Sequence, residues 1–362
     1  MDLPELCLVI PVLNERDNVA PLVAAVGVAL AGIAWEIIFV DDDSRDGTRD
    51  AIAGVAQTQP NVRLLHRIGR RGLASAFIEG AQASLAPLIG AIDGDMQHDE
   101  RLLPQMVAAL RSGDYDLAIG SRHVAGGGLG EWDRTRAGMS DIATKLSRLV
   151  LKVPVSDPMT GFFMIRRETF NQAVRGLSAI GFKILLDIVA SLPTPPRIKE
   201  LPYVFRTRVA GESKLDAGVL RDFALLLVDK MVGHIVPVRF VLFAGVGLLG
   251  IAAHLLVLRA GMTWEGMRFD RAQLLATAVA IIGNFILNNI FTFGDRKLKG
   301  WRFWRGLLTF SAICAVGALG NLGVASFLFG QASSWWFAGL VGAAMSLVWN
   351  YAVSSVVTWR RK

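Results

Sequence analysis

The sequence predicts an α/β domain, Rossmann-like with a mostly parallel sheet, followed by an all-α domain of four transmembrane helices. In residues 1–230 short apolar runs alternate with helical patterns, whereas residues 237–357 are mostly apolar, with charges confined to a few short stretches. Strands that alternate with helices indicate a parallel sheet covered by helices on both faces. We therefore expect the α/β domain over 1–215, interfacial amphipathic helices over 216–236 and the membrane domain over 237–362.

Five apolar runs in the first half predict the strands of the sheet. They are Leu6–Ile10, Trp35–Val40, Val62–His66, Leu88–Ile92 and Tyr115–Gly120. Helical patterns stand between them, the clearest over 73–84 and 100–111. In such sheets ligands bind beyond the carboxyl ends of the strands. The polar clusters at those ends predict a site built from Asn14 and Glu15, Asp41–Ser44, Asp93–Gln97, and Ser121 and Arg122.

Four segments of the second half are long enough and apolar enough to cross a bilayer, which needs about 20 apolar residues. They cover approximately 238–258, 272–293, 304–328 and 335–357. A Lys or Arg at the centre of a span costs about 2.5–3.5 kcal/mol. The charge pattern supports the four spans, because the arginines near them lie at the ends of the spans and not at their centres. These are Arg239, Arg259, Arg271 and Arg305.

Basic residues outside the spans predict the orientation in the membrane. The loop between the second and third spans is basic from Arg296 to Arg305, and the C-terminus carries Arg360, Arg361 and Lys362. By the positive-inside rule, both are cytoplasmic. An even number of spans then places the first domain in the cytoplasm, and the N-terminus has no signal-peptide pattern. The formal charge of +7 therefore indicates an integral membrane protein in contact with membrane lipids, and no nucleic-acid partner.

The strongest chemical motif, Asp93-Gly94-Asp95-Met96-Gln97-His98, directly follows a predicted strand. Two carboxylates on such a turn supply the oxygen ligands that Mg²⁺ or Mn²⁺ prefers, and Gln97 could add a neutral oxygen. The metal would bridge the diphosphate of a nucleotide and stabilise it as a leaving group. Gly94 lets the backbone approach the phosphates. We expect His98 either behind the metal ligands or at the surface, and not as a ligand itself. The alternative interpretation of the motif is a plain acidic turn.

A second acidic cluster, Asp41-Asp42-Asp43-Ser44, ends the second predicted strand, and Asp46-Gly47-Thr48 follows it. Three consecutive carboxylates repel one another, so the run requires solvent, a helix to cap or donor groups of a ligand. We predict that Ser44, Asp46 and Thr48 cap the next helix. Asp42, nearest to the strand end, is predicted to accept hydrogen bonds from a base or a ribose.

Seven motifs in this order resemble the family-2 inverting glycosyltransferases of GT-A fold. They are PVLNE (11–15), VDDDSRDGT (40–48), RRGLASAFIEG (70–80), DGDMQH (93–98), GSR (120–122), DPMTGF (157–162) and RVAGESKL (208–215). The set is similar to the dolichol-phosphate mannose synthase branch and its bacterial polyprenyl-phosphate glycosyltransferase relatives, over roughly residues 5–225. The membrane half resembles the GtrA-like domain, more loosely, through its four spans and the segment 283–293.

The resemblance implies roles for individual residues. Pro11, Leu13, Glu15, Val40 and Asp42 would hold the nucleoside, whereas Asp93, Gly94, Asp95 and Gln97 would hold the metal and the diphosphate. Phosphate charge would be neutralised by Arg122, Arg208 and Lys214, and these three with Asp95 are the expected catalytic residues. Fixed cations at a departing diphosphate lower the barrier. Without the motif around them, Arg208 and Lys214 would indicate only a solvated basic loop.

The acceptor implied is a polyprenyl or dolichyl monophosphate. Its second pKa lies near 6, so it is largely ionised at pH 7 and needs no dedicated general base. Arg136 and Ser140 stand one helical turn apart after a glycine-rich loop. We assign them, with Arg134, to the acceptor phosphate, and a basic helix at the membrane surface is the alternative. Asp157 stays ambiguous between binding a sugar hydroxyl and capping the next turn.

Several features of the second half leave alternatives open. Residues 216–235 predict amphipathic helices that lie at the membrane interface or pack on the first domain. The span asparagines, such as Asn284 and Asn350, either hydrogen bond between helices or line a polar path. Glycines in the spans allow close helix contact. Assembly into a homo-oligomer also stays open.

The function we expect is inverting transfer of a hexose from a nucleotide sugar to the lipid phosphate, with mannose from GDP-mannose favoured. A UDP-glucose-dependent glucosyltransferase is the alternative within this class. A lipid-linked sugar flippase or carrier with a sensory first domain is the alternative of another class. A processive polysaccharide synthase is disfavoured because the sequence lacks a QxxRW motif.

Overall fold

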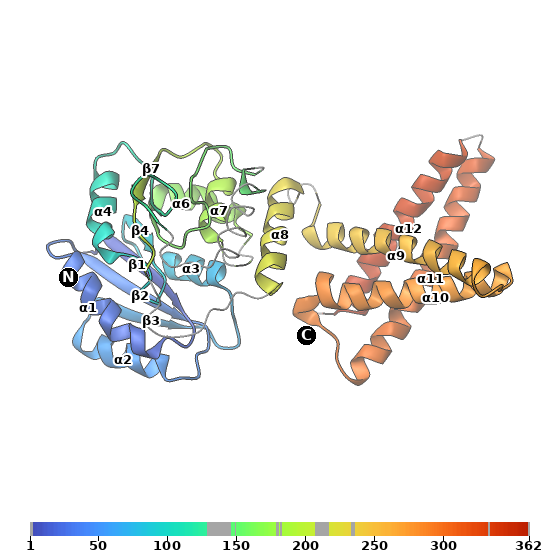
Figure 1. Ribbon diagram of the computed structural model, residues 1–362, viewed down its shortest axis with the longest axis horizontal. Coiled ribbons are helices and arrows are strands. Elements are labelled where there is room, and N and C mark those ends of the chain that lie inside the picture. Colours follow the sequence, from blue (N-terminus) through green and yellow to red (C-terminus); the bar gives the residue numbers. More distant parts are fainter. Residues whose placement is uncertain are drawn as a thin grey trace. The chain divides into compact units, whose positions relative to one another are not determined.

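The computed structural model describes residues 3–128, 146–148, 150–178, 181, 183–206, 217–232, 236–331 and 334–360 (Figure 1). The chain divides into two compact units, Met1–Met231 and Val232–Lys362. Each unit has a hydrophobic core of its own, and each is described by itself.

The first unit is built on a seven-stranded sheet in the order β3-β2-β1-β4-β6-β5-β7. The strands are β1 (Leu6–Val12), β2 (Trp35–Asp41), β3 (Val62–His66), β4 (Leu88–Ala91), β5 (Leu117–Ser121), β6 (Phe163–Arg166) and β7 (Ile198–Pro202). All neighbouring pairs are parallel except the two that β6 makes with β4 and β5. The mostly parallel α/β sheet predicted from the sequence is therefore confirmed.

Helices cover both faces of this sheet. One face packs against α1 (Val19–Ala29), α2 (Thr48–Thr58) and α4 (Leu103–Arg111), and the other against α3 (Leu73–Gln82), α6 (Arg167–Ala173) and α7 (Ile184–Ser191). Along β1 the side chains alternate between the two cores, with Leu8 in one and Val9 in the other. Short helical turns are η1 (Arg16–Asn18), η2 (Glu100–Leu102) and η3 (Val174–Gly176).

Two strands were not expected from the sequence, and a third is shifted. β6 is four residues long, and β7 (Ile-Lys-Glu-Leu-Pro) is half exposed, so neither has a run of apolar residues long enough to stand out. The fifth predicted strand, Tyr115–Gly120, begins two residues later, at Leu117. These three strands form one end of the sheet, where β6 reverses direction between β4 and β5.

Helix α8 (Ala217–Val232) packs against the first unit. Its Phe223 and Leu226 are buried in a cluster with Met159 and Leu186, the latter from α7. One turn further along, Lys230 forms an ion pair with Asp187 of α7 at 2.5 Å. Packing on the first domain, one of the two alternatives for this segment, is therefore observed.

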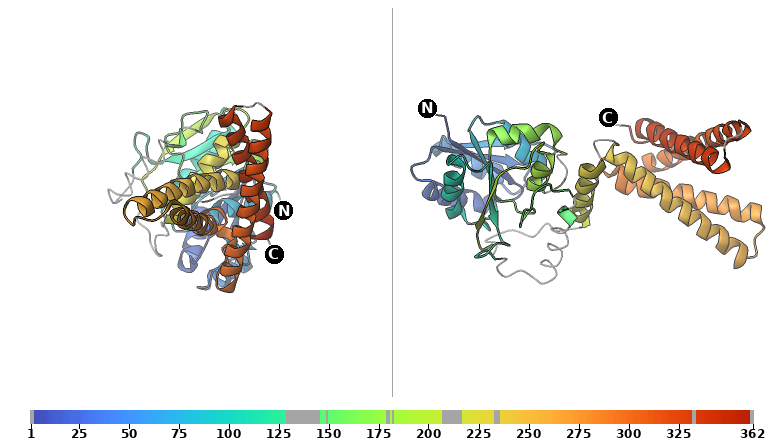
Figure 2. Two further views of the ribbon diagram at one scale, coloured as in Figure 1. Left: turned by 90° about the vertical axis from the view of Figure 1, so that its right-hand side faces the viewer. Right: turned by 90° about the horizontal axis from the view of Figure 1, so that it is seen from above.

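The second unit contains four long apolar helices, α9 (Val238–Thr263), α10 (Phe269–Leu287), α11 (Trp301–Gly330) and α12 (Trp335–Val357). A π-helical turn, η4 (Asn288–Thr292), extends α10, and η5 (Gly294–Arg296) follows it. All four are long and apolar enough to span a membrane, which makes this an integral membrane protein. Figure 2 shows α9 with α10, and α11 with α12, as two hairpins.

Asparagines pack against glycines inside each hairpin. A Cβ on Gly250 of α9 would collide with Asn284 of α10, and one on Gly342 of α12 would collide with Asn321 of α11. Trp359 joins the two hairpins, because it stacks on Phe293 at 4.3 Å and donates a hydrogen bond from Nε1 to Asn289 Oδ1 at 3.1 Å. Close helix contact is therefore one use of the glycines and asparagines in the spans.

Candidate active site

The turn after β4 carries Asp93, Gly94 and Asp95 beside the carboxyl end of β1. A Cβ on Gly94 would lie 2.8 Å from Val12 Cγ1, so only glycine lets the turn approach β1 this closely. Met96 has a φ of 60°, in the left-handed region that L-residues rarely adopt. The backbone of the turn is therefore tightly bent where the sequence predicts the diphosphate.

Asp93 is held from two sides. His98 Nε2 lies 3.0 Å from Asp93 Oδ2, and a Cβ on Gly161 would lie 2.8 Å from Asp93 Oδ1. Burial alone would raise the pKa of Asp93, but the charge and hydrogen bond of His98, with help from Lys183 and Arg122, hold it below its usual value. Asp93 is therefore an ionised carboxylate at neutral pH.

His98 owes its orientation to an aromatic cage. Its Nδ1 lies 2.9 Å from the Tyr203 hydroxyl, and its ring stacks on Phe162 at 5.0 Å. The side chain is 2% exposed, and it lies behind Asp93 instead of facing solvent. An imidazole fixed in this way orients a carboxylate ligand in the manner of the outer shell of metal sites.

Asp95 and Gln97 complete the turn. Asp95 is buried, and its Oδ1 accepts a hydrogen bond from the backbone N–H of Gln97 at 3.2 Å. The Gln97 side chain donates to the carbonyl of Arg206 at 3.0 Å, and the Arg206 N–H donates to the Gln97 carbonyl at 2.9 Å. Arg206 is therefore joined to this turn by two hydrogen bonds, whereas Arg208 and Lys214 lie outside the described residues.

These residues fit a divalent cation that takes part of its shell from a substrate. In the described ranges no three His, Cys, Asp or Glu side chains come together as a complete metal site. Mg²⁺ is commonly bound by one or two carboxylates together with substrate phosphates and water. Asp93 and Asp95 would supply the carboxylates, and the Gln97 amide oxygen would be the third oxygen on the same turn.

Arg122, at the end of β5, forms a buried pair with Asp157. Its Nε and Nη2 lie 2.7 and 2.8 Å from the two carboxylate oxygens, and its backbone N–H donates to Oδ2 at 3.1 Å. Burial would raise the pKa of Asp157, but Arg122 outweighs this and holds the pKa below its usual value. Asp157 thus binds Arg122, a role that differs from both the sugar contact and the cap considered from sequence.

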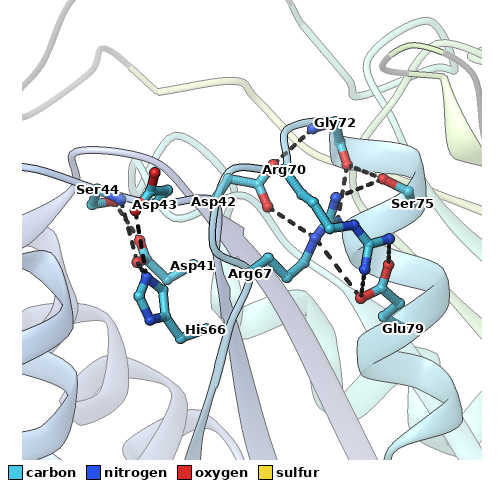
Figure 3. A network of polar contacts seen from close by, with 10 residues as sticks. All are labelled: Asp41, Asp42, Asp43, Ser44, His66, Arg67, Arg70, Gly72, Ser75 and Glu79. Carbon is cyan, nitrogen blue, oxygen red and sulfur yellow. Dashed lines mark hydrogen bonds and ion pairs between the residues drawn. The ribbon is translucent and has the colours of Figure 1, made fainter. Parts of the chain in front are cut away.

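Asp42 directly follows β2 and lies in the network of Figure 3. Its Oδ2 accepts a hydrogen bond from the Gly72 N–H at 2.7 Å, and its Oδ1 lies 3.3 Å from Arg67 Nε. Burial raises the pKa of Asp42, with Asp41 adding to the shift and Gly72 and Arg67 opposing it. The carboxylate is thus held by the loop between β3 and α3 before any ligand arrives.

The other predicted nucleoside residues lie at the same sheet edge. Pro11 pairs with Val40 in the β1–β2 register, and the Asp42 N–H donates to the Val12 carbonyl at 3.1 Å. The loop with Leu13 and Glu15 is tied to the second acidic cluster, since the Glu15 N–H donates to Thr48 Oγ1 at 2.9 Å. The structure therefore brings Pro11, Leu13, Glu15, Val40 and Asp42 to one edge.

The predicted helix cap is only partly correct. The N-cap of α2 is Gly47, with a φ of 93°, and it has no side-chain cap. Asp46 does accept a hydrogen bond from the Thr48 N–H at 3.0 Å, but Ser44 instead accepts one from the Asn14 N–H at 2.9 Å. The hydroxyls of Ser44 and Thr48 bind the β1 loop because it lies beside the start of α2.

Sequence reasoning missed Lys183, the residue before α7. Its ammonium donates to the Met159 carbonyl at 3.3 Å, in the loop that contacts Asp93 through Gly161. Burial and the positive charge of Arg122 lower the pKa of Lys183, while Asp93 and Asp157 oppose the shift. No motif marks this lysine in the sequence. The acceptor residues predicted from sequence, Arg134, Arg136 and Ser140, lie outside the described residues.

Known proteins resemble both units. The profile of glycosyl transferase family 2 matches residues 7–173, and that of the GtrA/DPMS transmembrane domain matches residues 242–359. A dolichol-phosphate mannosyltransferase of Pyrococcus furiosus is 33% identical over 358 residues, which are 97% of this chain and 98% of that protein. This match runs through both units of the chain.

Two further relatives and a solved structure match part of the chain. Dolichol-phosphate mannosyltransferases of Mycosarcoma maydis and Saccharomyces cerevisiae are 34% and 32% identical, over 66% and 60% of this chain and 84% of each relative. A structure of glucosyl-3-phosphoglycerate synthase from Mycobacterium tuberculosis matches at 15% identity with a TM-score of 0.49, over 63% of this chain and 79% of that one. The curated relatives are the stronger matches by sequence.

Proposed function

Because this chain belongs to the dolichol-phosphate mannosyltransferase branch of the family-2 glycosyltransferases, with a GT-A-like first domain and a GtrA-like transmembrane domain, we propose that it mannosylates a polyprenyl or dolichyl monophosphate. The donor proposed is GDP-mannose. The observation that carries the proposal is the position of the Asp93–Asp95 turn. Its Gly94 lies against Val12, whose carbonyl binds the Asp42 N–H, and its Asp93 lies against Gly161, in the loop whose Asp157 pairs with Arg122.

In this proposal the nucleoside binds at the edge formed by β1 and β2. Pro11, Leu13 and Glu15 would line it, Val40 would contribute through its backbone because its side chain is buried in the sheet core, and Asp42 would accept hydrogen bonds from the base or the ribose. Asp42 is already oriented by the Gly72 N–H and by Arg67, so binding does not have to order its side chain. Less ordering entropy is then lost on binding.

Asp93, Asp95 and Gln97 would hold Mg²⁺ or Mn²⁺ with the diphosphate. A metal bound there supplies Lewis-acid stabilisation of the leaving group. The chain's own contribution is to keep Asp93 ionised and oriented through His98. Arg122, fixed by Asp157, adds a buried positive charge to the site, and we assign Arg208 and Lys214 to the same phosphates.

The acceptor phosphate is the nucleophile. One of its oxygens forms a bond to the anomeric carbon while the bond from that carbon to the diphosphate oxygen breaks, and the nucleoside diphosphate leaves with the electron pair. Because a phosphate monoester is largely ionised at pH 7, no side chain has to remove a proton. Attack from the opposite side inverts the anomeric centre, and Arg134, Arg136 and Ser140 are assigned to the acceptor phosphate.

We further propose that the first domain and the C-terminus face the cytoplasm. Basic residues concentrate between Arg296 and Arg305 and at the C-terminus, as the positive-inside rule requires of cytoplasmic segments. The donor would then be taken from the cytoplasmic pool of nucleotide sugars, and the lipid phosphate from the cytoplasmic leaflet.

A donor screen tests the proposal. The purified full chain in detergent, with Mn²⁺ or Mg²⁺ and a polyprenyl phosphate, is incubated with GDP-mannose or UDP-glucose, and products are identified by mass. We expect a mannosyl phospholipid, and Asp95→Asn should lower the rate by about 10²–10³-fold. If only UDP-glucose serves as a donor, the protein is a glucosyltransferase and the mannose assignment is wrong. Absence of transfer from every donor by folded protein would favour the flippase or carrier alternative.

A further inference from the structure

Lys183 has more hydrogen-bond donors than the structure uses. Its ammonium carries three N–H donors. Among the described residues it has one acceptor, the Met159 carbonyl at 3.3 Å, and no carboxylate within ion-pair distance. A half-buried ammonium with unused donors is unfavourable unless an anion or water completes its shell.

The surroundings of Lys183 belong to the active site. Met159 lies in the loop whose Asp157 binds Arg122 and whose Gly161 contacts Asp93. The charges of Asp93, Arg122 and Asp157 all act on the lysine ammonium. Asp157 is already paired with Arg122, and Asp93 already binds His98. Both nearby carboxylates therefore have other partners, and among the described residues the Lys183 ammonium lies beside the site without a carboxylate partner of its own.

The backbone of Lys183 is rigidly supported. It precedes α7, whose Ile184, Leu185 and Ile188 are buried in the sheet core. The next turn of α7 is held by the ion pair between Asp187 and Lys230. The backbone of Lys183 is thus held in place, and the contact of its ammonium with the Met159 carbonyl restricts the side chain, so less freedom is lost when a ligand binds.

We propose that Lys183 is a further substrate-binding residue, whose ammonium binds a phosphate oxygen beside Asp93. The phosphate belongs either to the acceptor lipid or to the donor diphosphate, and both present the same chemistry. This inference rests on the proposed function, since both substrates follow from it. A positive charge here would reduce the repulsion between an anionic nucleophile and an anionic leaving group.

The test compares Lys183→Met with Lys183→Arg and with Lys152→Met, an exposed lysine that serves as the control. For each full-length variant, GDP affinity is titrated with Mn²⁺ present, and KM for polyprenyl phosphate is measured separately. We expect Lys183→Met to lower kcat/KM by about 10- to 100-fold, Lys183→Arg to recover part of the loss, and Lys152→Met to match wild type. Weaker GDP binding assigns the donor phosphate, and a higher lipid KM assigns the acceptor phosphate.

A purely structural role predicts another pattern. If Lys183 only tethers the Met159 loop, Lys183→Met will lower the thermal midpoint and kcat while GDP affinity and lipid KM stay within twofold of wild type, and the proposal is overturned. The proposal is also overturned if Lys183→Met leaves kcat, GDP affinity and lipid KM unchanged. Failure of the proposed function can be told apart from failure of this inference. If the proposed function is wrong, the wild-type protein transfers no hexose. A loss of GDP affinity in Lys183→Met would still support a phosphate-binding role for Lys183 in that case.

Discussion

The buried pair between Lys230 and Asp187 makes a quantitative prediction about how α8 is held. Lys230 Nζ lies 2.5 Å from Asp187 Oδ1 and also donates to Gly176 O and Ser191 Oγ, each at 2.8 Å. The side chain of Lys230 is only 8% exposed, and that of Asp187 is 0% exposed. Lys230→Met removes the cation and leaves the buried Asp187 carboxylate without its ion-pair partner.

The expected loss follows from these contacts. Removing one partner of a buried ion pair costs about 3–5 kcal/mol. Asp187 keeps hydrogen bonds from the Ser178 N–H at 3.0 Å and the Ser178 hydroxyl at 2.8 Å, so we expect the lower end, about 3 kcal/mol. For a unit of this size each kcal/mol corresponds to about 2–4 °C, and the midpoint should fall by about 6–12 °C.

A buried thiol reports the unfolding of the first unit alone. Cys7 lies in β1 with no exposed surface, and burial raises its pKa to about 12, so it reacts only when the sheet opens. In a Cys314→Ala background, a fluorogenic maleimide follows Cys7 while the detergent-solubilised full chain is heated at one fixed rate. A fixed rate is needed because unfolding of such proteins is commonly irreversible.

Two further variants separate the charge effect from lost packing. In Lys230→Met/Asp187→Asn no charge is left unpaired, so the double variant should be more stable than Lys230→Met alone. Lys152→Met, on the surface, should stay within about 0.5 kcal/mol of wild type. A midpoint of Lys230→Met within about 2 °C of wild type would refute the reasoning, because about 1 kcal/mol or less would then be involved.

Three more predictions concern the site and the membrane unit. His98→Asn removes the imidazole that orients Asp93, and the Mn²⁺ concentration for half-maximal activity should rise by about 10- to 100-fold; an unchanged requirement would separate His98 from the metal. Asp157 has a pKa below its usual 3.8 because Arg122 outweighs burial, so its contribution to stability is complete above pH 3.8 and is lost as the pH falls through the lower folded-state value. Urea midpoints between pH 3 and 7 should therefore show a large deficit of Asp157→Asn at pH 7 that shrinks in acid, and a constant deficit would contradict the pairing. Trp359→Ala removes a buried ring that stacks on Phe293 and should cost about 3–5 kcal/mol, seen as earlier loss of helical circular dichroism in the same detergent; an unchanged melting curve would count against its role between the hairpins.

The fold class, the four apolar spans and the order of the site motifs could all be predicted from the amino-acid sequence. These features depend on local patterns. Apolar runs at strand length and helical periodicity report which segments form which element. Span length and charge placement report the membrane segments. Polar groups such as Asp93–Gln97 follow strand ends, and in a parallel sheet those ends meet at one edge.

Only the tertiary structure decided which partners these groups have. The His98–Tyr203 contact joins residues 105 positions apart, and the Arg122–Asp157 pair joins residues 35 apart. Lys183 and Lys230 belong to no motif, yet one reaches the site loop and the other holds α7. Such contacts depend on how α7, α8 and the late strands pack. Local periodicity carries no information about a partner that long-range packing brings within hydrogen-bond distance.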